Sequence, residues 1–201
     1  TNGHSVTMLD IKQEFIDRGV KTITNDLNFL VKKEKMTAER KDELLGGLKT
    51  SVDRAVAKDA DFIMEVILER MDLKKDLLKE LDGILPAHCI IGTNTSALSI
   101  TEIASAVPNR ADKVIGCHFF NPAQIMKLVE VTRGIQTSDE TYKTAFELMA
   151  SLGKTPVSVV EGPGFVVNRI LIPMINEAIG IYADGLASPS DIDLAMQNGA
   201  G

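Results

Sequence analysis

The amino-acid sequence predicts an α/β fold with a parallel sheet, followed by a segment that contains only helices. Along most of the chain, short apolar runs alternate with longer segments in which apolar residues recur every three or four positions. This alternation is typical of strands and helices in an α/β fold. From Val166 onward the helical period continues without a strand. Because Gly162-Pro163-Gly164 separates the two patterns, we expect one domain over residues 1–163 and a second over residues 164–201.

Strands are expected where a short apolar run is bounded by turn or charged residues. The run SVTMLD ends at Asp10, and DFIMEVI, HCIIGTN and KVIGCHFF are apolar enough to be buried on both faces of a sheet. In chain order, the expected strands cover residues 5–10, 50–53, 61–67, 88–94, 113–120, 127–132 and 156–160.

Helices are expected between these strands, and several carry start or stop signals. Ser99 and Glu102 form the pattern of a capping box. Ser188 with Pro189 is a strong helix start, while Gly83 and Gly153 end the helices before them. In chain order, the expected helices cover residues 12–34, 37–47 and 70–85, a short helix from 99, residues 138–153 and 166–183, and a last helix from 188.

The composition is that of a soluble globular protein and excludes several classes of function. Apolar residues make up 44% and charged residues 25% of the 201 residues. A net charge of −6 disfavours a nucleic-acid surface, although it permits a local basic site. The longest apolar run contains Asn176 and Glu177 and is too short and polar to span a membrane. Cys89 and Cys117 lie in apolar runs and are expected to be free core thiols, which fits a cytoplasmic protein.

The chain resembles the 3-hydroxyacyl-CoA dehydrogenases, and among them the bacterial 3-hydroxybutyryl-CoA dehydrogenases. Several motifs carry the resemblance in the family's order and close to its spacing: NTSALSI (94–100), HFFNPAQIMKLVEV (118–131), GPGFVVNRILIPMINEA (162–178) and SPSDID (188–193). The resemblance implies a Rossmann-like, doubly wound sheet followed by the start of an all-α C-terminal domain. It also implies NAD as cofactor, an acyl-CoA substrate, a homodimer and no metal.

The sequence departs from the family at both ends. Family members open with a strand and a G-x-G-x-x-G turn before the segment that corresponds to GHSVTMLD, and they continue past the segment that corresponds to QNGAG. We therefore expect an incomplete chain whose sheet lacks its first strand. In a sheet of order 3-2-1-4-5-6 the first strand is central, so we expect a gap, or a substitute strand, between residues 5–10 and 61–67. Without the glycine turn, the 201-residue chain taken literally would be a poor enzyme.

His118 and Glu130 are the candidate catalytic pair. Oxidation of a secondary alcohol needs a base for the hydroxyl proton, and histidine is the usual choice. His118 ends an apolar strand, and its position alone fits a core histidine as well as a base; the resemblance implies the base. Glu130 lies inside the apolar run KLVEV, where it either faces outward or needs a partner such as His118. The resemblance implies the His–Glu pair.

Ser96 and Asn168 complete the catalytic set that the resemblance implies. Ser96 closes the NTS turn after a strand, and the resemblance implies that it binds the substrate oxygen beside the nicotinamide. A turn or cap hydroxyl is the structural alternative. Asn168 lies early in an apolar helix and would orient the substrate near His118, or it caps the helix terminus.

Cofactor and coenzyme A contacts are expected at four further residues. Asp10, at the end of a strand, is suited to the adenosine ribose hydroxyls, although it is also compatible with a solvated residue or a helix cap. Glu69 and Lys74 match cofactor-contacting positions of the family or belong to a solvated helix face. Lys33, in a basic cluster with Lys32 and Lys35, matches a lysine that binds coenzyme A phosphates, or belongs to a solvated helix end.

The resemblance therefore implies NAD-dependent oxidation of an (S)-3-hydroxyacyl-CoA to the 3-ketoacyl-CoA, or its reversal, in fatty-acid or butanoate metabolism. A non-catalytic fragment or a crystallin-like relative of the same fold is the alternative, favoured by the missing glycine turn. A 2-hydroxy-acid or sugar-acid dehydrogenase is disfavoured by HFFNP together with NTS and GFVVNR.

Asp10 predicts a preference for NAD over NADP. A carboxylate accepts hydrogen bonds from two ribose hydroxyls and repels a 2′-phosphate. We expect kcat/KM for NADH to exceed that for NADPH when the two are compared at one acyl-CoA concentration. A preference for NADPH would contradict this assignment.

Overall fold

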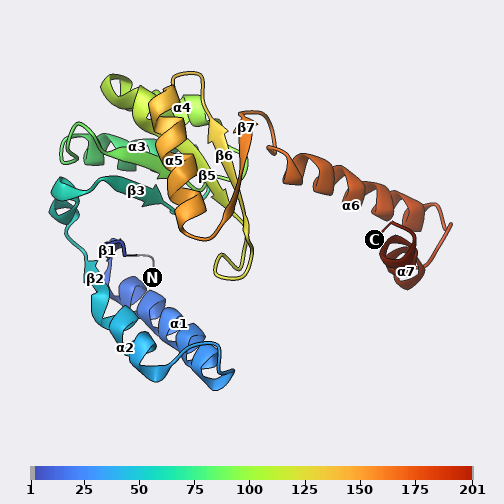
Figure 1. The fold of residues 1–201 in the computed structure, drawn as a ribbon. Coiled ribbons are helices and arrows are strands. Elements are labelled where there is room, and N and C mark those ends of the chain that lie inside the picture. The colour runs from blue at the N-terminus through green and yellow to red at the C-terminus, as the bar shows by residue number, and fades with distance from the viewer. Residues whose placement is uncertain (1–2, 201) are drawn as a thin grey trace. The chain divides into compact units, whose positions relative to one another are not determined.

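The computed structural model describes residues 3–200 and divides into two compact units. One unit comprises the residues up to 63 together with 76–90, and the other comprises residues 64–75 together with those from 91 onward. The main elements are traced in Figure 1.

The first unit contains a two-stranded parallel sheet, which α1 (Gln13–Lys32) and α2 (Ala38–Gly47) accompany. β1 (Val6–Leu9) pairs with β2 (Leu48–Ser51). α1 packs against α2 and β2, and its Ile16 is buried. A 3-10 helix, η1 (Arg54–Asp59), follows. The brief strand expected at residues 50–53 therefore begins two residues earlier, at Leu48.

A five-stranded sheet supports the rest of the fold (Figure 1). Its strands, in spatial order, are β3 (Phe62–Glu65), β4 (Ile90–Thr93), β5 (Val114–Phe119), β6 (Leu128–Arg133) and β7 (Thr155–Val160). The predicted Rossmann-like α/β fold is confirmed. No described strand joins β1 to β3, because β1 and β2 form a sheet of their own, which agrees with the expected gap.

The five-stranded sheet contains an antiparallel pair, whereas the sequence predicts a parallel sheet. β5 and β6 are antiparallel, whereas β4–β5 and β6–β7 are parallel. Only eight residues, 120–127, connect β5 to β6, and a parallel crossover needs about a dozen or more. The antiparallel register places His118 directly opposite Glu130.

Helices α4 (Ile100–Ala104) and α5 (Asp139–Ser151) pack against this sheet. The predicted capping box is confirmed in part, since the Ser99 hydroxyl accepts the Glu102 N–H. The close approach of α4 to β5 requires Gly116, because a Cβ there would lie 2.9 Å from both Ile100 Cδ1 and Thr132 Cβ. The core residues of this region are Ile91, Ile100, Ile103, Ile115, Val129, Val131, Ala145 and Met149. Two further helices are α3 (Met71–Asp82) and η2 (Pro108–Lys113), a 3-10 helix.

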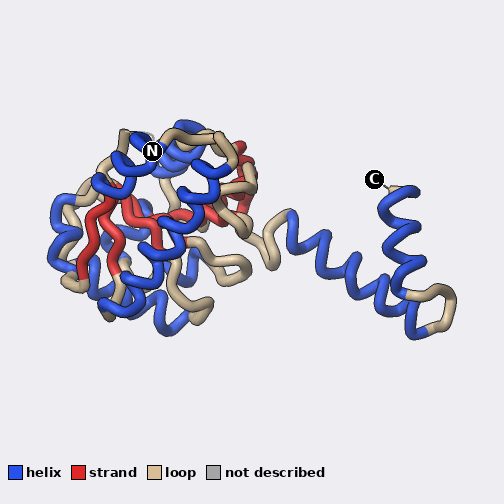
Figure 2. Tube along the Cα trace, turned by 90° about the horizontal axis from the view of Figure 1, so that it is seen from below, coloured by secondary structure: helices blue, strands red, loops and turns tan. Residues whose placement is uncertain are grey.

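After β7 the described chain is helical, as predicted (Figure 2). α6 (Val167–Ala183) contacts α7 (Pro189–Gly199), and the Ser188 hydroxyl caps α7 by accepting the Asp191 N–H. Neither helix has a buried residue. Within residues 3–200, no helix combines the length and apolarity needed to cross a membrane.

Both cysteines are free and fully buried, as the sequence predicts. Cys117 lies on β5 beside His118. Burial raises the pKa of the Cys117 thiol to about 12, because a thiolate is poorly solvated in the core. Cys117 is therefore an unreactive core residue at neutral pH.

Candidate active site

His118 and Glu130 form a buried pair across β5 and β6. The His118 Nδ1 atom lies 2.7 Å from Glu130 Oε2, and the two residues are 5% and 0% exposed. The outward-facing alternative for Glu130 is therefore wrong. In the described part of the chain, His118 Nε2 has no hydrogen-bond partner. In the tautomer that donates Nδ1–H to the carboxylate, the Nε2 atom has a free lone pair.

The second oxygen of Glu130 holds the start of α6. Glu130 Oε1 accepts the backbone N–H groups of Val166 at 3.0 Å and Val167 at 2.9 Å. A helix N-terminus offers unpaired N–H groups and favours a negative charge. One buried carboxylate thus joins His118 to the first turn of the helix that contains Asn168.

The chain reaches α6 through a turn with two positive φ angles. Gly164 has φ 75° and Phe165 has φ 51°, and a Cβ at Gly164 would lie 3.0 Å from the Arg169 nitrogen. Glycine is suited to such a position because it has no Cβ. The turn buries Phe165 with its ring centroid 5.7 Å from that of His118, while Phe120 lies at 4.6 Å. The imidazole therefore lies among aromatic rings.

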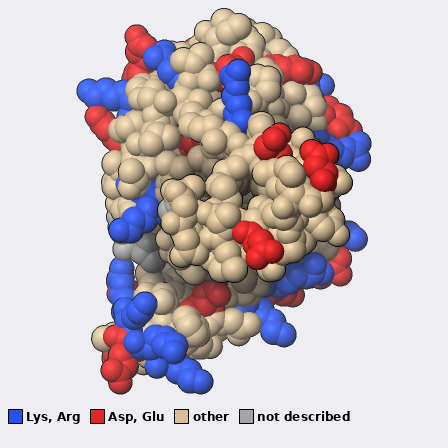
Figure 3. All heavy atoms as spheres, turned by 90° about the vertical axis from the view of Figure 1, so that its right-hand side faces the viewer, with Lys and Arg blue, Asp and Glu red and all other residues tan. Residues whose placement is uncertain are grey.

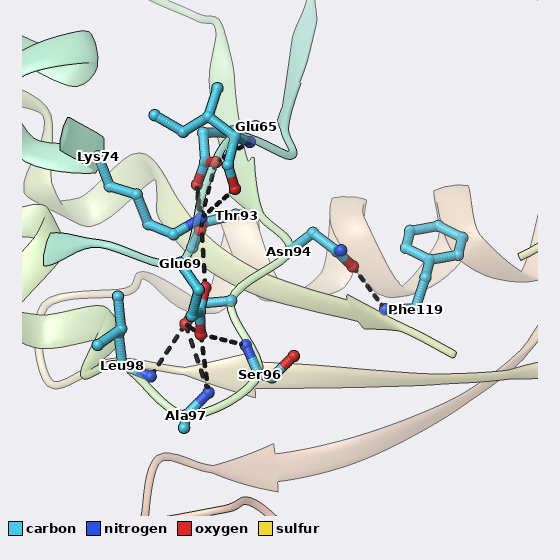
Figure 4. Close-up of polar contacts among 11 residues, drawn as sticks. Glu65, Glu69, Lys74, Thr93, Asn94, Ser96, Ala97, Leu98 and Phe119 are labelled. Carbon is cyan, nitrogen blue, oxygen red and sulfur yellow. Dashed lines mark hydrogen bonds and ion pairs between the residues drawn. The ribbon is translucent and has the colours of Figure 1, made fainter. Parts of the chain in front are cut away.

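The turn that carries Ser96 is held by Glu69 (Figure 4). Glu69 Oε1 accepts the Thr95 hydroxyl at 2.6 Å, the Ser96 N–H at 2.8 Å and the Ala97 N–H at 3.2 Å. The Ser96 hydroxyl points away from Glu69 and, among the residues described, forms no hydrogen bond. It is therefore available to a ligand and does not act as a turn hydroxyl.

Asn94 connects this turn to β5. Its Oδ1 accepts the N–H of Phe119 at 2.8 Å, one residue after His118. The Ser96 turn and His118 are thus fixed through neighbouring residues, without a hydrogen bond between Ser96 and His118 themselves.

Lys74 is buried and pairs with Glu65. Its ammonium lies 2.8 and 2.9 Å from the two Glu65 oxygens and 3.5 Å from Glu69 Oε2. Lys74 is only 1% exposed, so the solvated-face alternative is wrong for it. The side chain of Glu69 is 41% exposed. Burial acts to raise the pKa of Glu69, but the Thr95 and Ser96 hydrogen bonds and the Lys74 charge hold it below its ordinary value.

Glu65 is a further buried acid of the site that was not predicted, although the sequence carries a signal for it. Glu65 ends the apolar strand β3, and a carboxylate there needs a partner for the same reason as Glu130. Its remaining partners are the Thr93 hydroxyl at 2.5 Å and the Ile67 N–H at 2.7 Å.

Asn168 lies in the first turn of α6 and lines a pocket of about 600 Å³. The pocket also contacts Ala97, next to Ser96, and Arg169. The free N–H groups of Val166 and Val167 at the start of α6 are bound by Glu130, and no described hydrogen bond joins the Asn168 side chain to the helix terminus, so the structure gives the capping alternative for Asn168 no support. The pocket thus joins the Ser96 turn to the segment that Glu130 holds.

Asp10 and Lys33 belong to the other compact unit and are exposed. Asp10 follows β1, and its Oδ1 accepts the Ile11 N–H at 2.7 Å. Lys33 directly follows α1, and its ammonium lies 5.7 Å from the Phe29 ring centroid. Among the described residues, no group of three or more His, Cys, Asp or Glu could hold a metal ion.

The lowered pKa of Glu69 predicts a pH-dependent contribution to stability. A carboxylate whose pKa is lowered in the folded state stabilises the protein above its ordinary pKa of about 4.5, and this contribution disappears as pH falls through the lowered value. We expect Glu69→Gln to lower the free energy of unfolding by about 1 kcal/mol at neutral pH. Urea unfolding from about pH 6 to about pH 3.5 should show this difference shrinking. Glu147→Gln, at an exposed position on α5, is the control, and a difference independent of pH would contradict the assignment.

Two family models cover nearly the whole chain. The model of the 3-hydroxyacyl-CoA dehydrogenase NAD binding domain matches residues 1–162. The model of the 3-hydroxyacyl-CoA dehydrogenase C-terminal domain matches residues 164–201. The two matches meet at the glycine-rich turn that leads from β7 to α6.

Individual relatives agree with these matches. The chain is 51% identical to a 3-hydroxybutyryl-CoA dehydrogenase of Clostridioides difficile over 98% of its own length and 70% of the relative's. It is 40% identical to the human mitochondrial hydroxyacyl-coenzyme A dehydrogenase over 99% of this chain and 65% of the relative's length. The crystal structure of (S)-3-hydroxybutyryl-CoA dehydrogenase from Ralstonia eutropha matches with a TM-score of 0.96 at 46% identity, covering 99% of this chain and 70% of that one. The chain therefore belongs to the 3-hydroxyacyl-CoA dehydrogenases, a family of NAD-dependent oxidoreductases.

Proposed function

We propose that this protein interconverts (S)-3-hydroxyacyl-CoA, with 3-hydroxybutyryl-CoA as a substrate, and the 3-ketoacyl-CoA. The observation that carries the proposal is the buried His118–Glu130 pair, which leaves Nε2 of His118 without a partner among the described residues. The names of the bacterial relatives support the C4 substrate.

In the oxidative direction, Nε2 of His118 accepts the proton of the 3-hydroxyl group. Glu130, hydrogen-bonded to Nδ1, keeps the ring in the required tautomer and stabilises the imidazolium that forms. NAD, when bound, supplies the hydride acceptor. In the reductive direction, protonated His118 returns its proton to the carbonyl oxygen, as microscopic reversibility requires.

Ser96 and Asn168 orient the substrate in this proposal. The unpaired Ser96 hydroxyl donates a hydrogen bond to the reacting oxygen, and the Asn168 amide lines the pocket beside Ala97. Fixed donors of this kind are effective because they need no reorganisation as charge develops.

The residues proposed to contact NAD and coenzyme A fit these groups chemically. Asp10 is an exposed carboxylate directly after a strand, suited to ribose hydroxyls. Glu69 is partly exposed, whereas Lys74 is buried and contributes by fixing the charge and position of Glu69. Lys33, an exposed cation at a helix end, would bind a phosphate of coenzyme A.

The cellular compartment and the metabolic role are proposed as well. We infer that the protein acts in the cytoplasm, in fatty-acid or butanoate metabolism, since it has two free thiols and relatives named for 3-hydroxybutyryl-CoA. We also propose that the NAD-binding domain covers residues 1–163 and that the helical domain begins at residue 164, a division that the bounds of the two family models support.

His118→Ala tests the proposed function. Loss of a general base costs about a hundredfold or more in rate, so we expect reduction of acetoacetyl-CoA by NADH to fall by at least that factor while NADH binding is kept. His88→Ala is the control, because His88 is an exposed histidine paired with Asp61. Near-normal kcat in His118→Ala would remove this residue from the mechanism.

We also propose a homodimer that forms through α6. Apolar side chains are exposed around this helix, including Ile170 at 65% and Ile179 at 60%, and such a surface requires cover. In the face of the molecule that Figure 3 shows, residues other than Lys, Arg, Asp and Glu cover most of the centre of the view, with a few acidic residues among them.

Light scattering tests the homodimer. We expect a dimer for the unmodified protein and a monomer for Ile170→Lys combined with Ile179→Lys, because two buried charges without partners oppose association. Ile135→Lys, at an 85% exposed position outside α6, should remain dimeric. A monodisperse monomer of the unmodified protein would contradict this proposal.

A further inference from the structure

We propose that Glu161 is a positioning residue that connects the Ser96 turn to the turn leading into α6 and so sets Ser96 and Asn168 relative to His118. The inference rests on the proposed function, because it concerns the alignment of the residues assigned there. Glu161 is the first residue after β7 and does not contact the pocket beside Asn168.

The carboxylate of Glu161 binds the start of α4, which follows the Ser96 turn in the chain. Its Oε2 accepts the Ser99 hydroxyl at 3.2 Å and the Thr101 N–H at 2.9 Å, and its Oε1 accepts the Thr101 hydroxyl. Glu69 holds the Ser96 turn itself through Thr95 and Ser96. Two carboxylates from distant parts of the sequence thus fix the segment that presents Ser96.

Backbone groups connect Glu161 and the start of α4 to the end of β6. The Glu161 N–H donates to Arg133 O at 3.0 Å, and the Ile135 N–H donates to Thr101 Oγ1 at 2.9 Å. The Thr101 hydroxyl therefore donates its hydrogen to the Glu161 carboxylate and accepts a hydrogen bond from the Ile135 N–H. These bonds leave the Glu161 side chain little freedom relative to the sheet.

The chain between Glu161 and α6 is held at both ends by a carboxylate. Glu161 holds the beginning, and Glu130 holds Val166 and Val167 at the end. Between them lies the turn with positive φ at Gly164 and Phe165, so a shift at Glu161 passes directly to Asn168 and to the aromatic ring beside His118. Displacement of a catalytic group by about 1 Å can lower a rate by about a hundredfold.

Kinetics of Glu161→Ala in the full protein test the inference. We expect kcat for acetoacetyl-CoA reduction to fall at least tenfold, while each folded chain still binds one NADH. Misalignment slows the chemical step, so the isotope effect on kcat with NADH deuterated at the transferred position should rise. Glu161→Gln keeps the side-chain size and should lose less activity, which keeps the test valid if the alanine variant folds poorly.

A double variant and a matched control separate positioning from general destabilisation. Thr101→Val removes one of the three donors, and its combination with Glu161→Ala should be no slower than Glu161→Ala alone. Glu102→Ala removes a neighbouring carboxylate that pairs with Lys75, and it should keep the kcat and isotope effect of the unmodified protein. Unchanged kcat in both Glu161 variants, or a loss that equals the loss of NADH-binding sites, would overturn the proposal.

Hydrogen exchange distinguishes failure of this inference from failure of the proposed function. In Glu161→Ala, the amides of Ser96, Val166 and Val167 should exchange faster, although Glu161 binds none of them. If exchange accelerates in Glu161→Ala but the unmodified protein does not reduce acetoacetyl-CoA, the connection through Glu161 stands and the proposed function is wrong. If turnover is normal in the unmodified protein and exchange at these amides is unchanged in the variant, the inference is wrong and the function stands.

Discussion

The candidate site depends on one buried carboxylate, that of Glu130. It is fully buried and accepts hydrogen bonds from His118 and from two backbone N–H groups at the start of α6. An ionised carboxylate without such donors could not remain in the core, and breaking a buried pair by removing one partner costs about 3–5 kcal/mol. The carboxylate that orients the imidazole therefore also fixes where α6 begins.

Two other carboxylates around the site also accept hydrogen bonds from backbone N–H groups. Glu69 binds backbone N–H groups of the Ser96 turn, and Glu161 binds the first turn of α4. Backbone donors at turns and helix starts are otherwise unpaired, and carboxylates satisfy them with short, charge-assisted bonds. Glu65 has a different task, because it neutralises Lys74, which would otherwise be an isolated charge in the interior.

Much of this fold could be predicted from the sequence because its strands and helices carry regular apolar periods. The partner of Glu130 could also be inferred, since a carboxylate inside an apolar strand needs one. The antiparallel β6 was missed although the short connection of residues 120–127 indicates it. Lys74 was ambiguous because an amphipathic helix gives the same pattern whether a lysine faces solvent or a buried acid. The contacts of Asn94 and Glu161 depend on long-range packing, which local pattern does not encode.

The burial of Cys117 has a practical consequence. Thiols react with alkylating reagents as thiolates, and a pKa of about 12 with no exposed surface leaves almost none available in the closed sheet. Alkylation at Cys117 must therefore wait until β5 separates from its neighbours. Because Cys117 is adjacent to His118 on that strand, the rate at which this thiol is alkylated measures how often the scaffold of the imidazole opens, without an introduced cysteine.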